Sequence, residues 1–440
     1  MRSAVPKFLH PLAGVPLIAH VLRAAEALLP AQLVITVGPH TQAVRDAVGD
    51  RADYALQPVA RGTADAVQCA MPTLRREIEH VLVLYADVPL IEPQRLATLV
   101  DTTQTRSALI GAFSFAVDDP GSYGRFRFEG ERVVGVVEAA DDDRTYREPV
   151  VCNSGIGCFQ RDWLAEQLPR VSFNAKGEYY LTDLFAMAAC EQRRQPIVLL
   201  DAPFEAVQGV DDRVKLADAE AILRRRINER WMHEGVTLVD PNHTYIDIDV
   251  VLAPDTRIEP GCHLRGRTIV GSRCTLGPAT ILEDTVLGND VAVYSSWISG
   301  SVIGDGVDVG PYAHLRPGSV VEAGVHIGNY VETKNAHIGA GTAIGHFSYV
   351  GDAEIGRGVN VGAGTITCNF DGVRKHRTVV GDGVFLGSDT MLIAPVEVGE
   401  GARTGAGSVV NRDVPPGRTV AGVPARVIGP KRNSEEPEQS

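Results

Sequence analysis

The chain has 440 residues, enough for two domains, and its 55 acidic residues exceed its 42 basic residues to give a formal net charge of −13. This charge disfavours a nucleic-acid binder and a protein that adheres to anionic membranes. The seven cysteines include no Cys-x-x-Cys pair, which argues against a zinc site or a disulfide framework. No apolar run is long enough to span a bilayer, so we expect a cytoplasmic protein.

Residues 1–210 alternate aliphatic, strand-like runs with segments of helical periodicity. This alternation predicts an α/β domain with a mainly parallel sheet covered by helices. The pattern predicts helices after Pro16, over 64–71 and after Pro93, a strand over 33–37 and a buried strand over 80–84.

Asp87 follows the predicted 80–84 strand directly. Ligands gather at the carboxyl ends of strands in sheets of this kind. A carboxylate there suits Mg²⁺, which takes one or two protein carboxylates and completes its shell with phosphate oxygens and water. A helix N-cap ahead of Pro89 is the alternative interpretation, and position alone does not decide between them.

Residues 211–235 are predicted to form a helical linker. Within it Ala219, Leu223, Ile227 and Trp231 recur every four residues and make one apolar stripe. The arginines at 224–226 spread around the remaining surface, which favours a solvated or interdomain face over a phosphate site.

A repeat of six residues dominates residues 236–430. Neither a helix nor an alternating strand has this period, so the pattern favours a β-solenoid in which three hexapeptides make one coil. A sandwich would show turn signals every 8–12 residues instead. The last ten residues, 431–440, are charged and are predicted to be disordered. Clear runs of inward aliphatic positions are Leu252, Ile258, Leu264, Val270, Leu276 and Leu282, and later Val380, Leu386, Leu392 and Val398.

The phase of the repeat slips once or twice in its middle part, and a longer run interrupts it between Thr367 and Val380. The interrupting run, 368–377, carries Arg374, Lys375, His376 and Arg377. An insertion out of a solenoid is typically a loop on a binding face. Its positive charge suits a phosphorylated ligand such as coenzyme A, with a merely solvated loop as the alternative.

Several polar or glycine-containing breaks in residues 1–213 are weak signals singly and specific in combination. Together they resemble the sugar-1-phosphate nucleotidyltransferases. Joined to a hexapeptide solenoid, the chain resembles the bacterial bifunctional N-acetylglucosamine-1-phosphate uridyltransferases and glucosamine-1-phosphate acetyltransferases. The ordered set is Pro6-Lys7, Gln57 with Gly62-Thr63, Tyr85-Ala86-Asp87, Gly124, Glu138, Asn153, Tyr180 to Asp183 and Gln208 to Arg213.

The resemblance implies a left-handed parallel β-helix after a Rossmann-like nucleotidyltransferase domain, and a homotrimer. It implies acetyl transfer from acetyl-CoA to glucosamine-1-phosphate, then uridyl transfer from UTP to N-acetylglucosamine-1-phosphate, for peptidoglycan and lipopolysaccharide precursors. Asp87 and Asp211 would bind Mg²⁺, with Asp211 where the family usually has Asn. The uridyl-transfer ligands would be Lys7, Gln57, Gly62, Thr63, Tyr85, Ala86, Asp87, Gly124, Glu138, Asn153 and Asp211.

For acetyl transfer, the resemblance assigns the general base to His346. The amine of glucosamine must lose a proton as it attacks the thioester, and an imidazole can accept it near neutral pH. Arg316, Lys334, Tyr349 and Asn360 would bind the sugar phosphate, so that positioning lowers the barrier. The acetyl-CoA positions would be Ala363, Asn369, Phe370, Lys375, Ser388 and Ala406, with Phe370 where many members have Tyr.

Two other functions are alternatives to this interpretation. A zinc site of the γ-class carbonic anhydrase kind needs a His-x4-His pair, whereas His314, His326, His337 and His346 are 12, 11 and 9 residues apart. Alternatively the solenoid only oligomerises a nucleotidyltransferase, as in the ADP-glucose pyrophosphorylases. That alternative leaves the motifs around Lys334, His346 and Lys375 without a role.

The family's first domain begins with a buried strand and a Gly-rich turn that ends in Met. The sequence here starts at Met1-Arg-Ser-Ala-Val-Pro-Lys7, which aligns Met1 with the end of that motif. We therefore expect an N-terminally truncated first domain, with unpaired neighbouring strands, retained acetyl transfer and little uridyl transfer.

Overall fold

The protein is described by a computed structural model that covers residues 1–39, 41–142, 144, 146, 148–174 and 177–429. It divides into two compact units after Leu223. The first unit is α/β and the second is a stack of short strands, which confirms the predicted fold class. Within the described residues, no helix has the length and hydropathy needed to cross a membrane. The tail 431–440, predicted to be disordered, lies outside the described residues.

The main sheet of the first unit has the strand order β10-β6-β9-β7-β8, with β5 paired to β9. Strand β10 is parallel to β6, and β9 is antiparallel to both β6 and β5. Strands β5, β6 and β10 therefore share one direction, and β9 runs against them. The strands of this unit are β1 (Pro11–Leu12), β2 (Val15–Pro16), β3 (Val34–Val37), β4 (Asp53–Leu56), β5 (His80–Val83), β6 (Ile110–Val117), β7 (Arg125–Glu129), β8 (Arg132–Val137), β9 (Val150–Gln160) and β10 (Ile197–Asp201).

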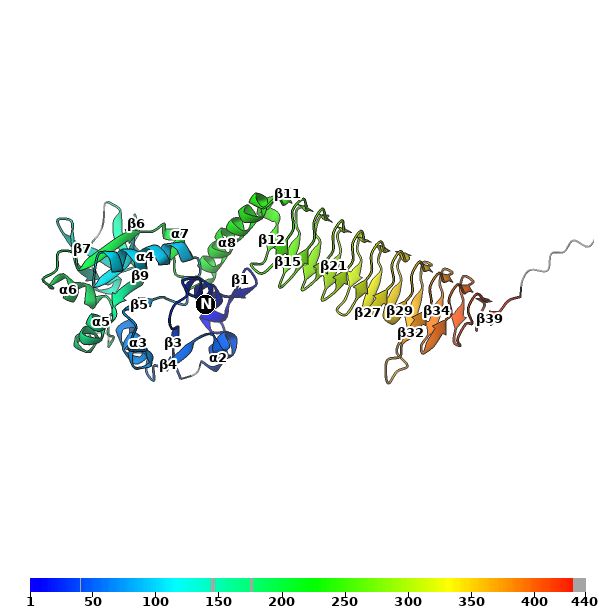
Figure 1. Cartoon of the computed structure of the whole chain (residues 1–440), viewed down its shortest axis with the longest axis horizontal. Coiled ribbons are helices and arrows are strands. Elements are labelled where there is room, and N and C mark those ends of the chain that lie inside the picture. Colours follow the sequence, from blue (N-terminus) through cyan, green and yellow to red (C-terminus); the bar gives the residue numbers. More distant parts are fainter. Residues whose placement is uncertain (40, 143, 145, 147, 175–176, 430–440) are drawn as a thin grey trace, which may run out of the picture. The chain divides into compact units, whose positions relative to one another are not determined.

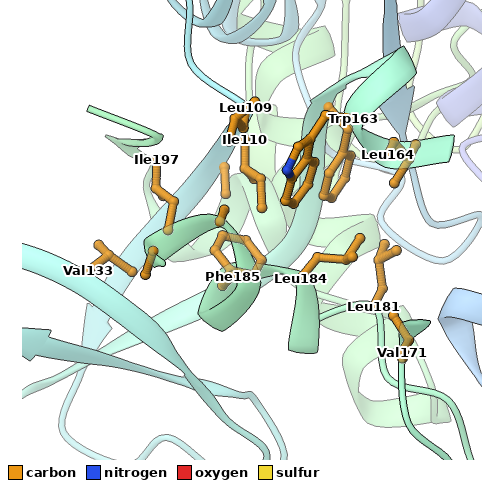
Figure 2. Close-up of a cluster of buried hydrophobic side chains, with 14 of the residues drawn as sticks. Leu109, Ile110, Val133, Trp163, Leu164, Val171, Leu181, Leu184, Phe185 and Ile197 are labelled. Carbon is orange, nitrogen blue, oxygen red and sulfur yellow. The ribbon is translucent and has the colours of Figure 1, made fainter. Parts of the chain in front are cut away.

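Helices cover the sheet and close two large apolar clusters. Figure 2 shows side chains of α5, α6 and β6 meeting in one of them, around Trp163, Phe185 and Ile110. The second cluster packs α4 against β6 and β9 through Leu96, Phe113 and other buried side chains. The helices are α1 (Leu17–Glu26), α2 (Gln42–Val48), α3 (Thr63–Ala70), α4 (Pro93–Thr105), α5 (Arg161–Gln167), α6 (Asp183–Ala189), α7 (Phe204–Val207) and α8 (Arg213–His233).

Two predictions for this unit are wrong. The main sheet is not mainly parallel, because among the described residues only its β10–β6 pair is parallel and its other pairs are antiparallel. The 80–84 strand is also not buried. All four residues of β5 are only partly buried, whereas β6 is buried from Ile110 to Phe115. The reason is that β6 has a hydrogen-bonded strand on each side, while β5 pairs only with β9. The parallel pair β3–β4 forms a separate small sheet.

Helix α8 matches the predicted linker helix. Its apolar stripe is largely buried, since Ala219, Ile227 and Trp231 are at most 5% exposed. In the second unit the buried Asn228 donates hydrogen bonds to the carbonyls of Pro241 (2.7 Å) and Thr244 (3.0 Å). The end of α8 is thereby attached to the start of the solenoid, where a stack of coils requires a cap.

The second unit is a parallel β-solenoid whose strands follow one another along a rod (Figure 1). Ile258 pairs with Leu276, eighteen residues later, and both side chains are fully buried. Three hexapeptides per coil are thus confirmed. One sheet contains β11 (Thr237–Leu238), β14 (Arg257–Ile258), β17 (Thr275–Leu276), β20 (Ala292–Val293), β23 (Asp308–Val309), β26 (His326–Asn329), β28 (Ala343–His346), β30 (Asn360–Val361), β33 (Phe385–Leu386), β36 (Arg403–Thr404), β38 (Thr419–Ala421) and β39 (Arg426–Val427).

The other two sides of the rod belong to one continuous sheet. Glycines let successive coils stack closely at the corners, because a Cβ at Gly328 would collide with the backbone of Gly345. The strands of this sheet are β12 (Tyr245–Ile246), β13 (Val251–Leu252), β15 (His263–Arg265), β16 (Ile269–Val270), β18 (Ile281–Glu283), β19 (Val286–Leu287), β21 (Trp297–Ser299), β22 (Val302–Ile303), β24 (His314–Leu315), β25 (Val320–Val321), β27 (Glu332–Ile338), β29 (Tyr349–Ile355), β31 (Ile366–Cys368), β32 (Thr378–Val380), β34 (Met391–Ile393), β35 (Val396–Val398) and β37 (Val409–Val410).

Candidate active sites in the two units

The first candidate site lies where β5 ends. The Lys7 Nζ atom is 2.5 Å from Asp87 Oδ2, and both side chains are partly exposed. The Val88 N–H donates to the Tyr85 carbonyl, and the next helix begins only at Pro93. The N-cap interpretation of Asp87 is therefore wrong. The carboxylate of Asp87 is instead paired with Lys7, which belongs to the same set of predicted site residues.

The segment around Asp211 lies against this carboxylate. The Val210 N–H donates to the Asp87 carbonyl over 2.8 Å, and the Gly209 N–H donates to the Tyr123 hydroxyl over 3.2 Å. Asp211 itself pairs with Lys215, with 2.9 Å between Nζ and Oδ1. The two predicted metal ligands thus lie on adjoining backbone segments, and each now has a lysine partner.

The turn from Gln57 to Thr63 is held in place by side-chain hydrogen bonds. Gln57 Nε2 donates to the Gly62 carbonyl (3.2 Å) and to Asp65 Oδ2 (2.8 Å), and Thr63 Oγ1 accepts from the Leu181 N–H. Gly62 has φ +104°, and a Cβ there would collide with the backbone of Tyr179. Only glycine fits this contact, which positions the start of α3.

Tyr85 follows β5 and packs directly over Gly155, where a Cβ would lie 2.8 Å from the ring. Removal from water raises the pKa of Tyr85 to about 12, although a hydrogen bond with Thr63 opposes the shift. The phenol is therefore neutral at physiological pH and can donate a hydrogen bond. Ala86, between Tyr85 and Asp87, packs against the small apolar cluster around Ile18 and Val44.

Gly124, Glu138 and Asn153 come together from three different segments. A Cβ on Gly124 would lie 3.4 Å from the Glu138 carboxylate, and the Asn153 N–H donates to the Gly124 carbonyl over 2.8 Å. Glu138 accepts from Thr182 Oγ1 at 2.6 Å. Burial raises the pKa of Glu138, because the charged carboxylate loses contact with water. A polar ligand that donates a hydrogen bond to the carboxylate would offset this loss of solvation.

The second candidate site lies on the solenoid, where β28 ends at His346. The ring Nδ1 lies 3.1 Å from Oδ1 of Asn329, which is the residue paired with His346 in the preceding coil. An amide oxygen only accepts, so in the neutral ring Nδ1 carries the proton and Nε2 is the nitrogen with the free lone pair. Asn329 was not predicted from the sequence, although its position seventeen residues earlier marks it as the neighbour of His346 in the stack of coils.

Three of the predicted sugar-phosphate residues lie on or beside strands of consecutive coils. Arg316 directly follows β24, Lys334 lies on β27 and Tyr349 begins β29. Arg316 pairs with Glu332 over 2.8 Å, and Glu332 is another residue that the sequence motifs do not indicate. The nearby Lys375 and then Arg316 lower the pKa of Lys334. Three cations thus share one surface, which favours binding of an anion.

The loop between β31 and β32 leaves the rod, as Figure 1 shows near β32, and its ends are fixed by two carboxylates. Asp352 accepts from Nδ2 of Asn369 (2.6 Å) and lies 3.9 Å from Nζ of Lys375. Asp371 accepts from the backbone N–H of Arg374 over 2.8 Å and contacts the His376 ring. The loop is therefore ordered, and a cavity of about 340 Å³ lies between it and the coils.

The remaining predicted residues lie on the first of the two solenoid sheets or at its corner. Asn360 pairs with Phe385 in the next coil. Ala363, Ser388 and Ala406 follow the inward residues of β30, β33 and β36 by two positions, and they recur at one corner. The backbone of successive coils stacks tightly at this corner. The Gly407 N–H donates to the carbonyl of Ser388, and the Asp389 N–H donates to the carbonyl of Ala363. Phe370 is 60% exposed on the loop.

Comparison with known proteins gives the same two-part division. Residues 1–154 match the MobA-like NTP transferase domain, and residues 377–412 match the bacterial transferase hexapeptide family of six repeats. A bifunctional protein GlmU from Kineococcus radiotolerans is 43% identical over 99% of this chain and 88% of its own length. The GlmU proteins of Rubrobacter xylanophilus and Mycobacterium tuberculosis are 44% and 41% identical over 97% and 99% of the chain, and 91% and 89% of their own lengths.

These relatives span almost the whole chain, and one family model lies in each of the two compact units. Nucleotidyl transfer and hexapeptide-type acetyl transfer together make UDP-N-acetylglucosamine. The chain belongs to the GlmU family of bifunctional acetyltransferases and uridyltransferases.

Proposed function

We propose that the solenoid transfers an acetyl group from acetyl-CoA to the amine of glucosamine-1-phosphate with His346 as general base. The observation that carries this assignment is the hydrogen bond from His346 Nδ1 to Asn329. In the neutral ring this hydrogen bond leaves the lone pair of Nε2 free, and Asn329 fixes the orientation of the ring. A general base requires both. The amine loses its proton to Nε2 as its nitrogen attacks the thioester carbonyl and forms the new C–N bond. The C–S bond then breaks, and coenzyme A leaves as the thiol by taking the proton back from Nε2.

Arg316, Lys334, Tyr349 and Asn360 are proposed to bind the sugar phosphate. Arginine and lysine beside each other suit a phosphate that carries two charges. Acetyl-CoA would lie along the corner column and the loop. Its proposed contacts are Ala363, Asn369, Phe370, Lys375, Ser388 and Ala406, of which Asn369 and Lys375 are already held by Asp352.

In the first unit the proposed reaction is uridyl transfer from UTP to N-acetylglucosamine-1-phosphate. Lys7 would neutralise phosphate, and the neutral phenol of Tyr85 and the carboxylate of Glu138 would contact nucleotide or sugar hydroxyls. Further ligands are proposed at Gln57, Gly62, Thr63, Ala86, Gly124 and Asn153. The product would feed peptidoglycan and lipopolysaccharide precursors in the cytoplasm.

The donor set at Asp87 and Asp211 fits Mg²⁺. Two carboxylates on adjoining segments, each now neutralised by a lysine, are the ligands that this ion takes together with phosphate oxygens and water. The described residues contain no cluster of three such side chains, so substrate oxygens would complete the shell. Bound Mg²⁺ would withdraw charge from the phosphates, while Lys7 and Lys215 hold the carboxylates in place.

A homotrimer is proposed from the outward face of the solenoid. One column of β-branched side chains runs across five coils in exact register and is 39–51% exposed. Such a column is a typical interface between rods. Light scattering should therefore give three chains per particle, and a fully active monomer would contradict the proposal. The column comprises Val251, Ile269, Val286, Val302 and Val320.

The alternative, a solenoid that only oligomerises the first unit, predicts no acetyl chemistry. The test is thiol release from acetyl-CoA in the presence of glucosamine-1-phosphate. His346→Ala should lower the rate by roughly 10²–10⁴-fold. His326→Ala is the matched control, because His326 is also an exposed rod histidine but pairs with Asp308. Equal rates for the two variants would remove His346 from this role, and no thiol release by the unaltered protein would favour the alternative.

A further inference from the structure

One side of the solenoid carries a row of glycines at equivalent positions of successive coils. Gly345, Gly362, Gly387 and Gly405 each follow an inward residue of the sheet that contains β28, β30, β33 and β36, and these strands pair in register. A Cβ at Gly387 would lie 2.7 Å from backbone atoms of the next coil, so close stacking requires glycine here. The glycine row therefore presents backbone without side chains.

Two columns of side chains border the glycine row. The corner column proposed for acetyl-CoA, from His346 to Ala406, directly follows the glycines in the sequence. On the other side, Asn360, Phe385 and Arg403 lie two positions before the glycines and pair with one another in consecutive coils. A ligand that extends along the row from His346 therefore passes Phe385 and Arg403.

Coenzyme A matches the length of this row. Its pantetheine arm has about as many backbone bonds as four amino-acid residues, and it spans roughly 14 Å when extended. His346 and Ala406 are three coils apart, which is also about 14 Å at the usual spacing of parallel strands. With the thioester at His346 and the arm along the glycine row, the diphosphate would lie in the coil of Arg403.

Arg403 is an exposed cation without an acidic partner in the part of the chain that the structure describes. Its guanidinium lies 5.0 Å from the centre of the Phe385 ring, which is 41% exposed. Other arginines of the rod, such as Arg257 and Arg273, pair with carboxylates. A guanidinium that lies over a ring keeps its N–H donors free for an anion, and a phosphate accepts such hydrogen bonds well.

A second exposed arginine lies farther along the row. Strand β38 pairs with β36 and continues the row with Ala421, which lies opposite Arg426 of the antiparallel β39. Directly opposite residues of antiparallel strands share a face, so Arg426 lies on the same outward face as Ala421. Nη1 of Arg426 donates to the adjacent Ala425 carbonyl over 2.8 Å, and no carboxylate contacts this side chain within the described ranges. Arg426 is two strands beyond Arg403, a distance of about 10 Å.

We propose that Arg403 binds the diphosphate of acetyl-CoA and that Arg426 binds its 3′-phosphate. This inference rests on the proposed acetyl transfer and adds the two side chains that distinguish coenzyme A from a thioester without a nucleotide. The ribose places the 3′-phosphate beyond the diphosphate, in the direction in which Arg426 follows Arg403. A charge-assisted hydrogen bond to each phosphate contributes more than a neutral one. In a chain with a net charge of −13, the two arginines also reduce the repulsion of a polyanionic ligand.

The test is isothermal titration calorimetry of the 440-residue protein with coenzyme A and with 3′-dephospho-coenzyme A. Arg426→Gln should weaken binding of coenzyme A about tenfold and leave binding of the dephospho form unchanged, because that form has no 3′-phosphate to lose. Arg403→Gln should weaken binding of both ligands about tenfold, because both contain the diphosphate. Arg403→Lys should recover part of this loss, since it keeps the charge. Arg267→Gln is the matched control, an exposed arginine of the rod in a coil well before His346, and should change neither affinity.

Unchanged affinities of the Arg403→Gln variant would overturn the inference, as would an Arg426→Gln variant that loses affinity for both ligands equally. Equal weakening by Arg267→Gln would show that only the net charge of the chain matters, and would also overturn it. So would the absence of coenzyme A binding to the unaltered protein at millimolar concentration. Thiol release tests the proposed acetyl transfer separately: normal release with a KM for acetyl-CoA that these variants leave unchanged would refute the phosphate contacts and retain the reaction.

Discussion

At the scale of single residues, acetyl transfer depends on the orientation of one imidazole. Asn329 Oδ1 accepts the proton of His346 Nδ1 and thereby selects the tautomer with a basic Nε2. We predict that Asn329→Ala lowers kcat of acetyl transfer by about tenfold, less than His346→Ala, because the ring is retained but no longer held. Steady-state thiol release measures this, with an unchanged KM for acetyl-CoA expected.

Asn329→Asp is the matched variant. A carboxylate still accepts from Nδ1, so most activity should be retained, and it stabilises the protonated ring. The acid limb of the pH–rate profile should therefore move to higher pH. An unmoved profile together with a normal rate for Asn329→Ala would show that Asn329 only supports the coil.

His346 and Asn329 also show which parts of the site can be predicted from the sequence. His346 lies in a short motif that resembles a known family, so it was predicted. Asn329 lies seventeen residues earlier, where the phase of the repeat slips, and only the stacking of coils brings it to the ring. Glu332 beside Arg316 and Asp352 beside Asn369 were missed for the same reason, since each contact joins neighbouring coils.

At the scale of elements, the loop 369–377 depends on the carboxylate of Asp352 at its base. We predict that Asp352→Ala raises KM for acetyl-CoA about tenfold or more with little change in kcat, because Asn369 and Lys375 lose the partner that orders them. Asp305→Ala is the control, since Asp305 caps a coil corner through the Asn289 N–H and lies in an earlier coil. Equal KM values for the two variants would show that the loop is ordered without Asp352.

The carboxylate of Asp371 is expected to make the conformation of the same loop insensitive to pH above the acidic range. Hydrogen bonds from the Arg374 backbone and the His376 ring lower the pKa of Asp371 to about 2, from an ordinary value of 3.8. A lowered pKa contributes stability that is complete above the ordinary value and is lost as the pH falls through about 2. The loop should thus keep one conformation throughout the working range of the enzyme.

Local elements were predictable to the extent that their own sequence determines them. The hexapeptide period indicates where the inward aliphatics lie, and α1, α3 and α4 begin close to the expected residues. The burial of β5 was not predictable from its apolar sequence, because burial of a strand depends on having a neighbour on each side.

At the scale of the whole molecule, the two activities use different compact units, and only one of them has an open sheet. The proposed acetyl-transfer residues lie on the closed, stacked solenoid, where each coil is paired on both sides. The proposed nucleotide residues Tyr85 and Asp87 follow β5 and line a cavity of about 840 Å³ between β3 and β5. Their positions therefore depend on a strand that is hydrogen-bonded along one edge only.

We predict from this contrast that the 440-residue protein transfers acetyl groups at a normal rate but transfers uridyl groups at least 10²-fold more slowly. A displacement of about 1 Å in a positioning group can cost this much. Thiol release and pyrophosphate release, measured on one preparation, give the two rates. Comparable rates for both reactions would show that the open edge of β5 does not disturb Tyr85 and Asp87, and the prediction would then be wrong.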